Sequence, residues 1–282
     1  MKEHDYKLHR ANAAFLDGRY AEAIVEYQKG TRQEDPFAAI NLAYILREGI
    51  GTARNEKLAA SLYQSALYLD TSGVAAFNLA LLSMRGIGVP IDLNQALSYM
   101  EKSAEMRCID AQLYLGLAYL LGCVYDPVHI RAIHHIPSYH VVYNQEAALL
   151  EGEAPDPVLE DARWEVLMPD PERSAKMYRD GVKGHDIDEF SEQVGNARFM
   201  LGQSMIEGVG GAPRPRSGFR QLEAAALLSD NRDAAQYLLE NHELAAYYGV
   251  NVERIRGLLT ETAEKAAGRG RVALPQPKRP KK

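Results

Sequence analysis

Four of the eight histidines of this chain lie within one short stretch, HIRAIHHIPSYHVVY, and they are the side chains best suited to chemistry. They are His129, His134, His135 and His140. Imidazole nitrogens this close together can bind zinc or nickel. Their spacing lacks the H-x-x-x-H and C-x-x-C pairs of common metal sites, so we expect these histidines to face solvent and a neighbouring helix. The sequence therefore predicts no metal and no cofactor.

An alternative hypothesis makes the same stretch part of a metal- or thiol-dependent enzyme. One histidine would then act together with Cys123 or with a carboxylate that follows it: Glu146, Glu151, Glu153 or Asp161. No nucleophile elbow, phosphate-binding loop or zinc-protease motif accompanies them. The glycine-rich run at residues 208–211 does not follow a strand pattern, which disfavours nucleotide binding. The sequence therefore favours a protein that is not an enzyme.

The composition is that of an ordinary folded protein, with 46% apolar and 25% charged residues. No apolar run reaches the ~20 residues that a membrane-spanning helix needs. The first residues, MKEHDYKLHR, lack the apolar core of a secretory signal, so we expect a cytoplasmic protein. Cys108 and Cys123 lie in apolar helical sequence, where a reduced, buried thiol is the usual state.

Charge is distributed unevenly along the chain. The net charge is −6, yet six basic residues and no acidic ones lie in the last fourteen residues. Without those six, 26 basic and 38 acidic residues remain, a net charge of −12. We expect this acidic body to repel nucleic acid and anionic membranes. Residues 268–282 are rich in Pro, Lys and Arg and are expected to be disordered; they either have no role or contact an acidic partner.

The chain is organised around an internal repeat, which is clearest at residues 38–104. Asn41-Leu42 recurs 37 residues later as Asn78-Leu79, and Gly49-Ile50-Gly51 recurs as Gly86-Ile87-Gly88. Apolar residues recur at intervals of three and four, which indicates helices. A fixed period in the mid-thirties is typical of stacked helical hairpins, here called helix A and helix B. Related segments begin near residues 11, 110 and 195.

The fourth copy, DAQLYLGLAYLLG at residues 110–122, carries the pattern A-x-x-x-L-G-x-x-Y-x-x-G. This pattern, followed by a loop and A-x-x-[YL]-x-x-x-A, resembles the Sel1-like repeat, a relative of the tetratricopeptide repeat. The resemblance covers most of residues 36–226 outside one insertion. It implies an all-α fold, a right-handed superhelical solenoid of Sel1-like, tetratricopeptide-like hairpins. Relatives with such repeats act in signalling, in the assembly of membrane-associated complexes and as bacterial interaction factors.

The regular period fails after Gly122. The best match to the next helix B is centred on Ala175, which implies an insertion of roughly 43 residues that includes residues 125–168. We therefore expect one solenoid at residues 1–267, interrupted by this insertion, and a separate tail at 268–282. Trp164, the only tryptophan, either anchors the insertion on the solenoid or contacts a partner.

Helix A of such arrays lines a concave groove, so the exposed positions of each helix A are the candidate partner-binding residues. They are Asn41, Tyr44, Arg47, Asn78, Leu81, Arg85, Tyr114, Leu117, Gln203 and Glu207. A groove of mixed apolar, aromatic and polar side chains suits a protein or peptide. The recurring Asn41 and Asn78 either clamp a peptide backbone or form hydrogen bonds between repeats.

The most favoured function is thus a non-catalytic interaction scaffold or adaptor. Besides the enzyme hypothesis, a second alternative is a bacterial immunity or sequestering protein that binds and blocks a toxic enzyme.

Overall fold

The computed structural model describes residues 3–122, 124–125, 163–164, 169–185 and 191–269. Within these ranges the chain forms thirteen helices and one pair of two-residue strands. It divides into two compact units, Met1–His185 and Asp186–Lys282. The all-α fold class predicted from the sequence is confirmed. The cluster of four histidines and Cys123 lie outside the described residues, as does the chain after residue 269.

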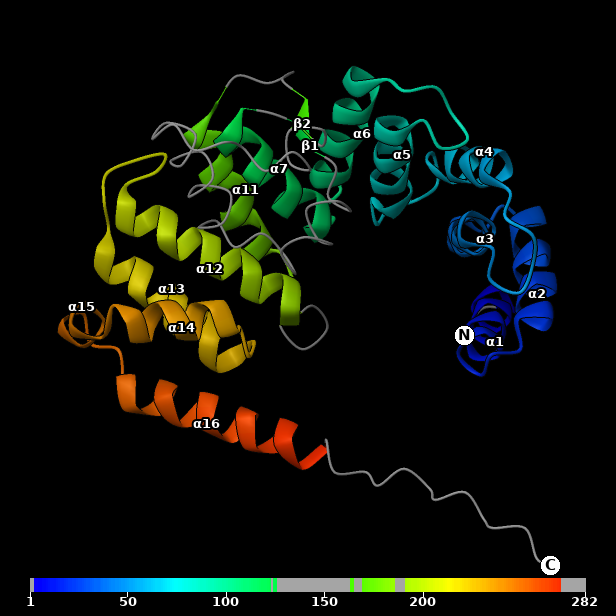
Figure 1. Ribbon diagram of the computed structural model, residues 1–282. Coiled ribbons are helices and arrows are strands. Elements are labelled where there is room, and N and C mark those ends of the chain that lie inside the picture. Colours follow the sequence, from blue (N-terminus) through cyan, green and yellow to red (C-terminus); the bar gives the residue numbers. More distant parts are fainter. Residues whose placement is uncertain (1–2, 123, 126–162, 165–168, 186–190, 270–282) are drawn as a thin grey trace, which may run out of the picture. The chain divides into compact units, whose positions relative to one another are not determined.

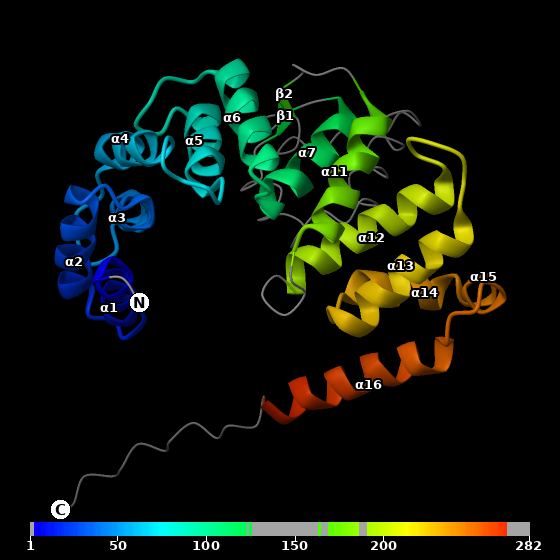
Figure 2. The ribbon, with the colours of Figure 1, turned by 180° about the vertical axis from the view of Figure 1, so that it is seen from behind.

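Unit 1 is a row of four helical hairpins. Their helices are α1 (Glu3–Leu16), α2 (Tyr20–Arg32), α3 (Pro36–Glu48), α4 (Glu56–Ala66), α5 (Val74–Arg85), α6 (Leu93–Glu105), α7 (Ile109–Leu121) and α11 (Pro171–Lys183). Each helix A packs against its helix B, and each helix B except the last packs against the next helix A. In Figures 1 and 2, α1, α3 and α5 lie on the inner side of the curve that these hairpins follow, with α2, α4 and α6 outside.

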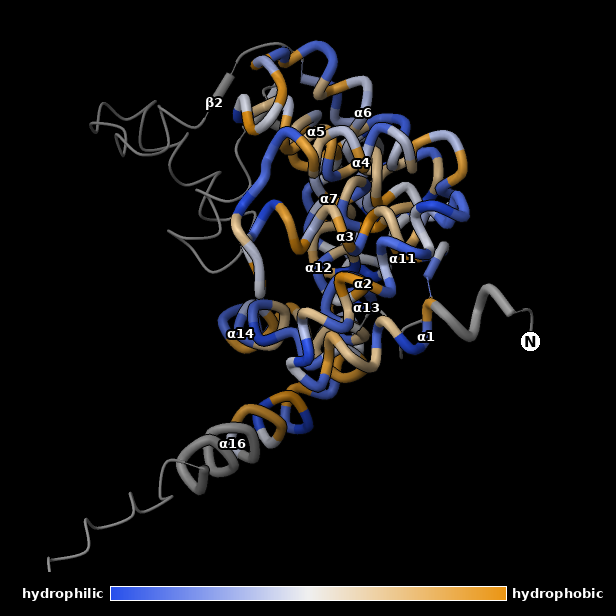
Figure 3. The backbone as a smooth tube through the Cα atoms, turned by 90° about the vertical axis from the view of Figure 1, so that its right-hand side faces the viewer, coloured by the Kyte–Doolittle hydropathy of each residue, from blue (hydrophilic) through white to orange (hydrophobic). Residues whose placement is uncertain are grey.

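Unit 2 begins with a fifth hairpin and ends in three further helices. The hairpin consists of α12 (Ser191–Glu207) and α13 (Pro215–Leu228). It is followed by α14 (Arg232–Glu240), the short α15 (His242–Tyr247) and α16 (Val252–Arg269). Helix α14 packs against both α13 and α16. Along these helices and those of unit 1, apolar and polar residues alternate in the manner of amphipathic helices (Figure 3).

A glycine in the left-handed conformation ends helix A of each hairpin. Gly49 and Gly86, for example, have φ values of 75° and 67°, which an L side chain adopts only with strain. The second glycine of the Gly-Ile-Gly turn is required for a different reason. A Cβ added to Gly88 would lie 2.2 Å from the carbonyl oxygen of Glu56 in the preceding hairpin. The second glycine is therefore required for close packing of successive hairpins.

One backbone hydrogen bond closes the turn between helix A and helix B. The N–H of the residue just before helix B donates to the carbonyl three residues before the turn glycine. The pairs and N···O distances are Asn55 to Leu46 at 2.8 Å, Asp92 to Ser83 at 3.0 Å, Asp170 to Tyr119 at 2.7 Å and Arg214 to Met205 at 2.6 Å. In unit 1 the side chains of the first three donor residues also cap helix B. The fourth hairpin is therefore closed like its neighbours, although residues 123–169 separate its turn glycine from Asp170.

The two ends of the insertion meet. Strand β1 (Val124–Tyr125) pairs antiparallel with β2 (Arg163–Trp164), and Val124 lies opposite Trp164. The chain thus leaves the hairpin after Gly122 and returns beside the point of departure. The helix B predicted around Ala175 is confirmed as α11, in which Ala175 is buried. The side chain of Trp164 lies outside what the structure describes, so both hypotheses about it stay open.

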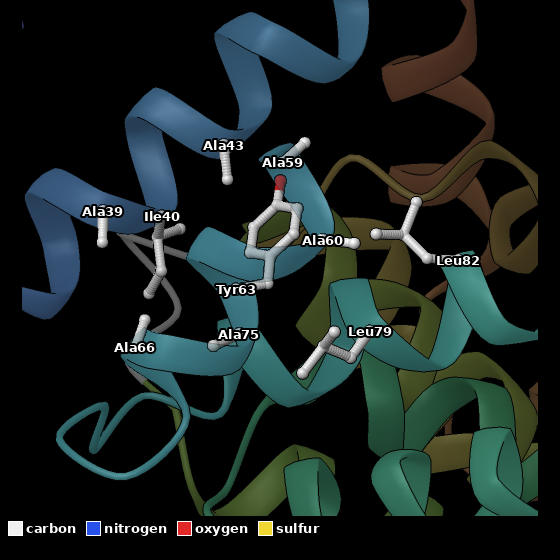
Figure 4. Packing of buried hydrophobic residues seen from close by; sticks show 10 residues of the cluster. All are labelled: Ala39, Ile40, Ala43, Ala59, Ala60, Tyr63, Ala66, Ala75, Leu79 and Leu82. Carbon is white, nitrogen blue, oxygen red and sulfur yellow. The ribbon is translucent and has the colours of Figure 1, made fainter. Parts of the chain in front are cut away.

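The core between hairpins is built from small residues and a few large ones. One cluster joins α3, α4 and α5 and holds six alanines around Ile40, Tyr63, Leu79 and Leu82 (Figure 4). Tyr63 is fully buried, and burial raises the pKa of its hydroxyl to about 12. Because alanine methyl groups occupy little space, the helices pack closely around this one ring.

In hairpin four a glycine takes the place of such an alanine. Gly116 on α7 occupies the position of Ala43 on α3, and a Cβ added there would lie 2.4 Å from Cε1 of Tyr178 on α11. The ring of Tyr178 is 1% exposed, so it has little room to move. Glycine at this position is therefore explained by the tyrosine that packs against it.

We predict that Gly116→Ala lowers the free energy of unfolding by ~1–3 kcal/mol, because the added methyl group overpacks the α7–α11 contact. Urea unfolding followed by circular dichroism measures the change. Gly257→Ala on α16 is the matched control, since nothing lies within 4 Å of a Cβ at Gly257. Its expected effect is neutral or slightly stabilising. Equal destabilisation of both variants would contradict the packing explanation.

We also predict that hairpin four folds without its insertion. Residues 123–169 are replaced by Ile-Gly-Val-Pro-Ile, the connection that hairpin three uses at residues 87–91. Because the closing hydrogen bond and the Asp170 cap remain available, helices α7 and α11 should keep slow amide hydrogen exchange. Fast exchange throughout both helices, with the other hairpins still protected, would show that the insertion is needed for this hairpin.

Candidate protein-interaction surfaces

Two neighbouring helices A present the same face of unit 1. On α3 the positions are Phe37, Asn41, Tyr44 and Arg47, and on α5 they are Val74, Asn78, Leu81 and Arg85; together they are here called the helix-A surface. Residues spaced by four and three lie on one face of a helix, which is why the sequence predicted six of these eight together. Phe37 and Tyr44 are 43% and 42% exposed. The helix-A surface therefore offers two aromatic rings to solvent.

Tyr44, Arg47 and Asn78 form a connected group across α3 and α5. The Arg47 guanidinium carbon lies 5.4 Å from the centre of the Tyr44 ring, a cation–π contact. Its Nη1 donates to Oδ1 of Asn78 at 2.8 Å, and its Nε donates to Glu48 Oε1 at 2.7 Å. Arg47 is consequently held in one position, and it holds the exposed tyrosine ring in turn.

The two recurring asparagines make hydrogen bonds within and between hairpins. Asn78 Nδ2 donates to the Val74 carbonyl at 2.9 Å, while its oxygen accepts from Arg47. Asn41 Nδ2 donates to Asn12 Oδ1 at 3.3 Å, and the same oxygen accepts from the Tyr27 hydroxyl at 2.8 Å. Of the two roles weighed for these residues, the structure shows hydrogen bonds between repeats. A peptide clamp through Asn78 would have to replace bonds that already exist.

Three of the predicted partner-binding residues are not on the surface. Tyr114 and Leu117 are 4% and 5% exposed, and Gln203 is 0% exposed. The hydroxyl of Tyr114 donates to the Met84 sulfur at 3.6 Å, so this side chain joins α7 to α5. The assignment of these three residues to an accessible groove is therefore wrong. Leu81 is half-buried, and Arg85 and Glu207 are exposed, so their role in partner binding stays a prediction.

A pocket of about 740 Å³ lies on the other side of unit 1, between the second helices α6 and α11. One face of α7 forms its floor. Its lining residues are Glu101, Ala104, Glu105, Arg107, Gln112, Leu115, Tyr119, Arg173, Lys176, Met177, Asp180, Lys183 and Gly184, here called the α6–α11 pocket. The size is in the range of ordinary small-ligand and peptide-anchor sites.

Hydrogen bonds close one end of the pocket around Tyr119. The Tyr119 hydroxyl donates to Glu101 Oε1 at 2.6 Å and accepts from Arg173 Nη1 at 3.4 Å. The Arg173 guanidinium also lies 5.4 Å from the centre of the ring. Burial and the bond to Glu101 raise the pKa of Tyr119 to about 12, so the hydroxyl stays protonated and can donate.

Arg107 and Gln112 close the opposite end. Nη2 of Arg107 donates to the Gly184 carbonyl at 2.6 Å, which ties the α6–α7 turn to the end of α11. Nε2 of Gln112 donates to the Ala104 carbonyl at 3.3 Å. Its Oε1 therefore accepts from His185 Nε2, also at 3.3 Å, which assigns the proton to Nε2 of that imidazole.

Sequence reasoning missed this pocket, although a signal was present. In DPERSAKMYRDGVKG, Arg173, Lys176, Asp180 and Lys183 follow one another at intervals of three and four. That spacing places them on one face of α11. The residues of α6 and α7 that face α11 could not be identified from the sequence. The long insertion separates α11 from α6 and α7 along the chain, so the sequence does not show that these helices are close in space.

The described residues contain few other side chains suited to catalysis or metal binding. Among them no cluster of three or more His, Cys, Asp or Glu side chains could hold a metal ion. Cys108 is buried as expected, and burial raises the pKa of its thiol. No helix in the described part of the chain is both long and apolar enough to cross a membrane.

We predict that Asn78→Ala lowers the free energy of unfolding by about 1–2 kcal/mol, because Arg47 loses a half-buried hydrogen-bond acceptor between two hairpins. Thermal and urea unfolding measure the effect. Asn94→Ala, an exposed position of α6, is the control and should change stability by less than ~0.5 kcal/mol. If the Asn78 variant is as stable as the Asn94 control, the hydrogen bonds of the Asn78 amide are not needed for stability, and the amide is available to a partner.

Comparison with known proteins places these hairpins in a family. The Sel1 repeat profile matches residues 36–70, 73–108 and 109–135. A Sel1 repeat protein from Oxalobacter formigenes has a similar structure, with 18% identity and a TM-score of 0.56 over 77% of this chain and 48% of that one. The c5321 protein, a protective antigen of uropathogenic Escherichia coli with an SLR fold, shares 19% identity over 99% of this chain and 58% of its own length, with a TM-score of 0.44.

The chain thus spans about half the length of the Oxalobacter protein, and the likeness concerns the fold. The first two profile matches each cover one complete hairpin, α3–α4 and α5–α6, and the third begins at the start of α7. Three consecutive repeats with the expected turns, caps and small core residues agree with the resemblance drawn from the sequence. Residues 36–135 therefore contain three consecutive matches to the Sel1 repeat.

Proposed function

We propose that this chain is a non-catalytic scaffold or adaptor whose helix-A surface in unit 1 binds a protein or peptide partner. Sel1 repeat folds generally mediate protein–protein interaction, which supports the general class. The specific surface rests on the geometry of α3 and α5. These helices expose aromatic and aliphatic side chains next to arginines, a combination that favours protein partners.

The observation that carries the proposal is the fixed, exposed Tyr44 ring. An aromatic side chain contributes most to binding when little entropy is lost on ordering it. The cation–π contact with Arg47 and the hydrogen bond from Arg47 to Asn78 already restrain the ring before a partner arrives. Phe37 extends the same face by two helical turns. Tyr44 is therefore the expected centre of the interface.

Charge supports a protein partner in preference to nucleic acid. The body of the chain is acidic, so a polyanion would be repelled at long range. Arg47 and Arg85 are local exceptions on the helix-A surface, and they can pair with individual carboxylates of a partner. The apolar contacts would come from Phe37, Tyr44 and Leu81.

The test is affinity purification with quantitative mass spectrometry, comparing the wild-type chain with Tyr44→Ala. Partner recovery should fall at least about fivefold, since truncation of a central aromatic residue commonly costs more than 1 kcal/mol of binding free energy. Tyr68→Ala is the matched control, because Tyr68 is 86% exposed but lies in the turn after α4. A reproducible partner that both variants retain would move the interface away from the helix-A surface, and the absence of any reproducible partner would overturn the scaffold proposal.

A further inference from the structure

The α6–α11 pocket has two walls of unlike charge. The α11 wall carries Arg173, Lys176 and Lys183 with one acid, Asp180, whereas the α6 wall carries Glu101 and Glu105. Glu101 is already engaged by the Tyr119 hydroxyl and lies 4.0 Å from Arg173. The charges at that end of the pocket are thus balanced within the protein, and they leave little for a ligand.

The other end is different. Within the described residues, Arg107, Lys176 and Lys183 form no ion pair with a carboxylate, and the guanidinium of Arg107 donates to the Gly184 carbonyl. Two acids of the lining, Glu105 and Asp180, likewise form no ion pair within the described residues. Three cations against two carboxylates leave this end positive, although the protein body has a net charge of −12. A negatively charged group is therefore the complementary ligand.

Arg107 supplies its cation from an unusual backbone position. Its φ is 66°, in the left-handed region that favours glycine. Two other turns from helix B to helix A contain a residue of the same kind, Glu34 and Asp230, so the conformation belongs to the turn. The arginine at this position turns back to the end of α11, where its guanidinium lines the pocket. Its position is consequently fixed at both the backbone and the side chain.

Part of the remaining lining is apolar. Leu115 on the floor and Ala104 on the α6 wall are 1% and 7% exposed, so the partly buried Met177, on the α11 wall between the lysines, is the apolar side chain that a ligand can reach. Methionine adapts its shape to different apolar partners more easily than branched side chains do. A ligand that fits this lining has an aliphatic group between its charges. A single inorganic anion would leave the apolar lining uncovered.

We propose that the α6–α11 pocket is a second binding site, which takes an acidic peptide segment with an aliphatic side chain. The peptide carboxylates pair with Arg107, Lys176 and Lys183, and its aliphatic side chain packs against Met177. The walls of this site are the second helices α6 and α11, whereas the helix-A surface lies on α3 and α5. It therefore allows the scaffold to hold two partners, or two segments of one partner, at once.

The probe is the peptide Leu-Glu-Asp-Leu-Glu-amide with fluorescein attached to its N-terminal amine, titrated with the full chain by fluorescence polarisation. Two reference peptides replace the acids by Gln and Asn or by Lys. The acidic peptide should bind best, and its affinity should fall as salt is raised from 50 to about 300 mM because charge pairs are screened. Binding of the neutral or lysine peptide as tightly as the acidic one would overturn the proposal.

Variants locate the site. Lys176→Glu/Lys183→Glu should weaken binding of the acidic peptide at least tenfold. The control Lys57→Glu/Arg220→Glu makes the same change in net charge at exposed positions of α4 and α13, and should change binding less than twofold. Equal weakening by both double variants would show that only net charge matters and would overturn the site.

Arg107→Gly removes the guanidinium and keeps the turn, because glycine adopts the left-handed conformation without strain. It should weaken the peptide severalfold while circular dichroism remains that of the wild type. Tyr44→Ala should leave peptide binding unchanged, so failure of the helix-A surface and failure of the pocket can be distinguished. An Arg107→Gly chain that is folded and binds the acidic peptide as the wild type does would remove Arg107 from the site.

Discussion

The structure depends on the way each turn between helix A and helix B is closed. A left-handed glycine ends the first helix, and in hairpins two to five the backbone N–H before the second helix donates to a carbonyl three residues before that glycine. In the first hairpin the Arg19 N–H donates to the Ala14 carbonyl, four residues before Gly18. These bonds satisfy backbone groups that a helix end leaves without partners, and each hairpin forms its bond from its own residues. The stacking of hairpins then needs only complementary apolar faces.

This local closure explains why hairpin four tolerates a long insertion. The backbone N–H of Asp170 donates to the Tyr119 carbonyl, just as that of Asp92 donates to the Ser83 carbonyl. The antiparallel pairing of Val124–Tyr125 with Arg163–Trp164 also brings the chain back beside the point where it leaves the hairpin. The entropy cost of a longer loop grows only slowly with its length. A helical hairpin can therefore carry extra sequence at its turn while its own packing, such as Tyr178 against Gly116, is preserved.

Polar side chains divide between holding the hairpins together and facing a partner. Asn41, Asn78 and Arg47 link neighbouring hairpins through hydrogen bonds, and Arg47, held by Asn78, also restrains the exposed ring of Tyr44. At the α6–α11 pocket, Tyr119 and Arg107 have the same double role at its two ends. In both places the residues that join helices also determine the shape and charge of a surface. The two proposed binding surfaces therefore depend on the same contacts that stack the hairpins.

The sequence by itself determined the repeat, the helices and their turns. Small residues and glycines at a fixed spacing reflect local constraints, so the recurrence of Gly49, Gly86 and Gly122 marks where each helix A ends, and the structure shows these glycines in the left-handed conformation. The helix-B match at Ala175 succeeded for the same reason. Of the candidate surface, the sequence found Tyr44, Arg47 and their α5 counterparts, because helical periodicity tells which residues share a face.

Only the tertiary structure decided which of those faces stay accessible. Leu117 and Gln203 occupy the position of the exposed Tyr44, and Tyr114 that of the half-buried Asn41 and Asn78, yet in their own repeats these three side chains are buried. The α6–α11 pocket likewise depends on α6 and α11, which are far apart in the sequence and lie close together only after hairpin four closes. Burial and pocket formation arise from contacts between distant segments. A repeating local pattern carries no information about which of its copies will be covered.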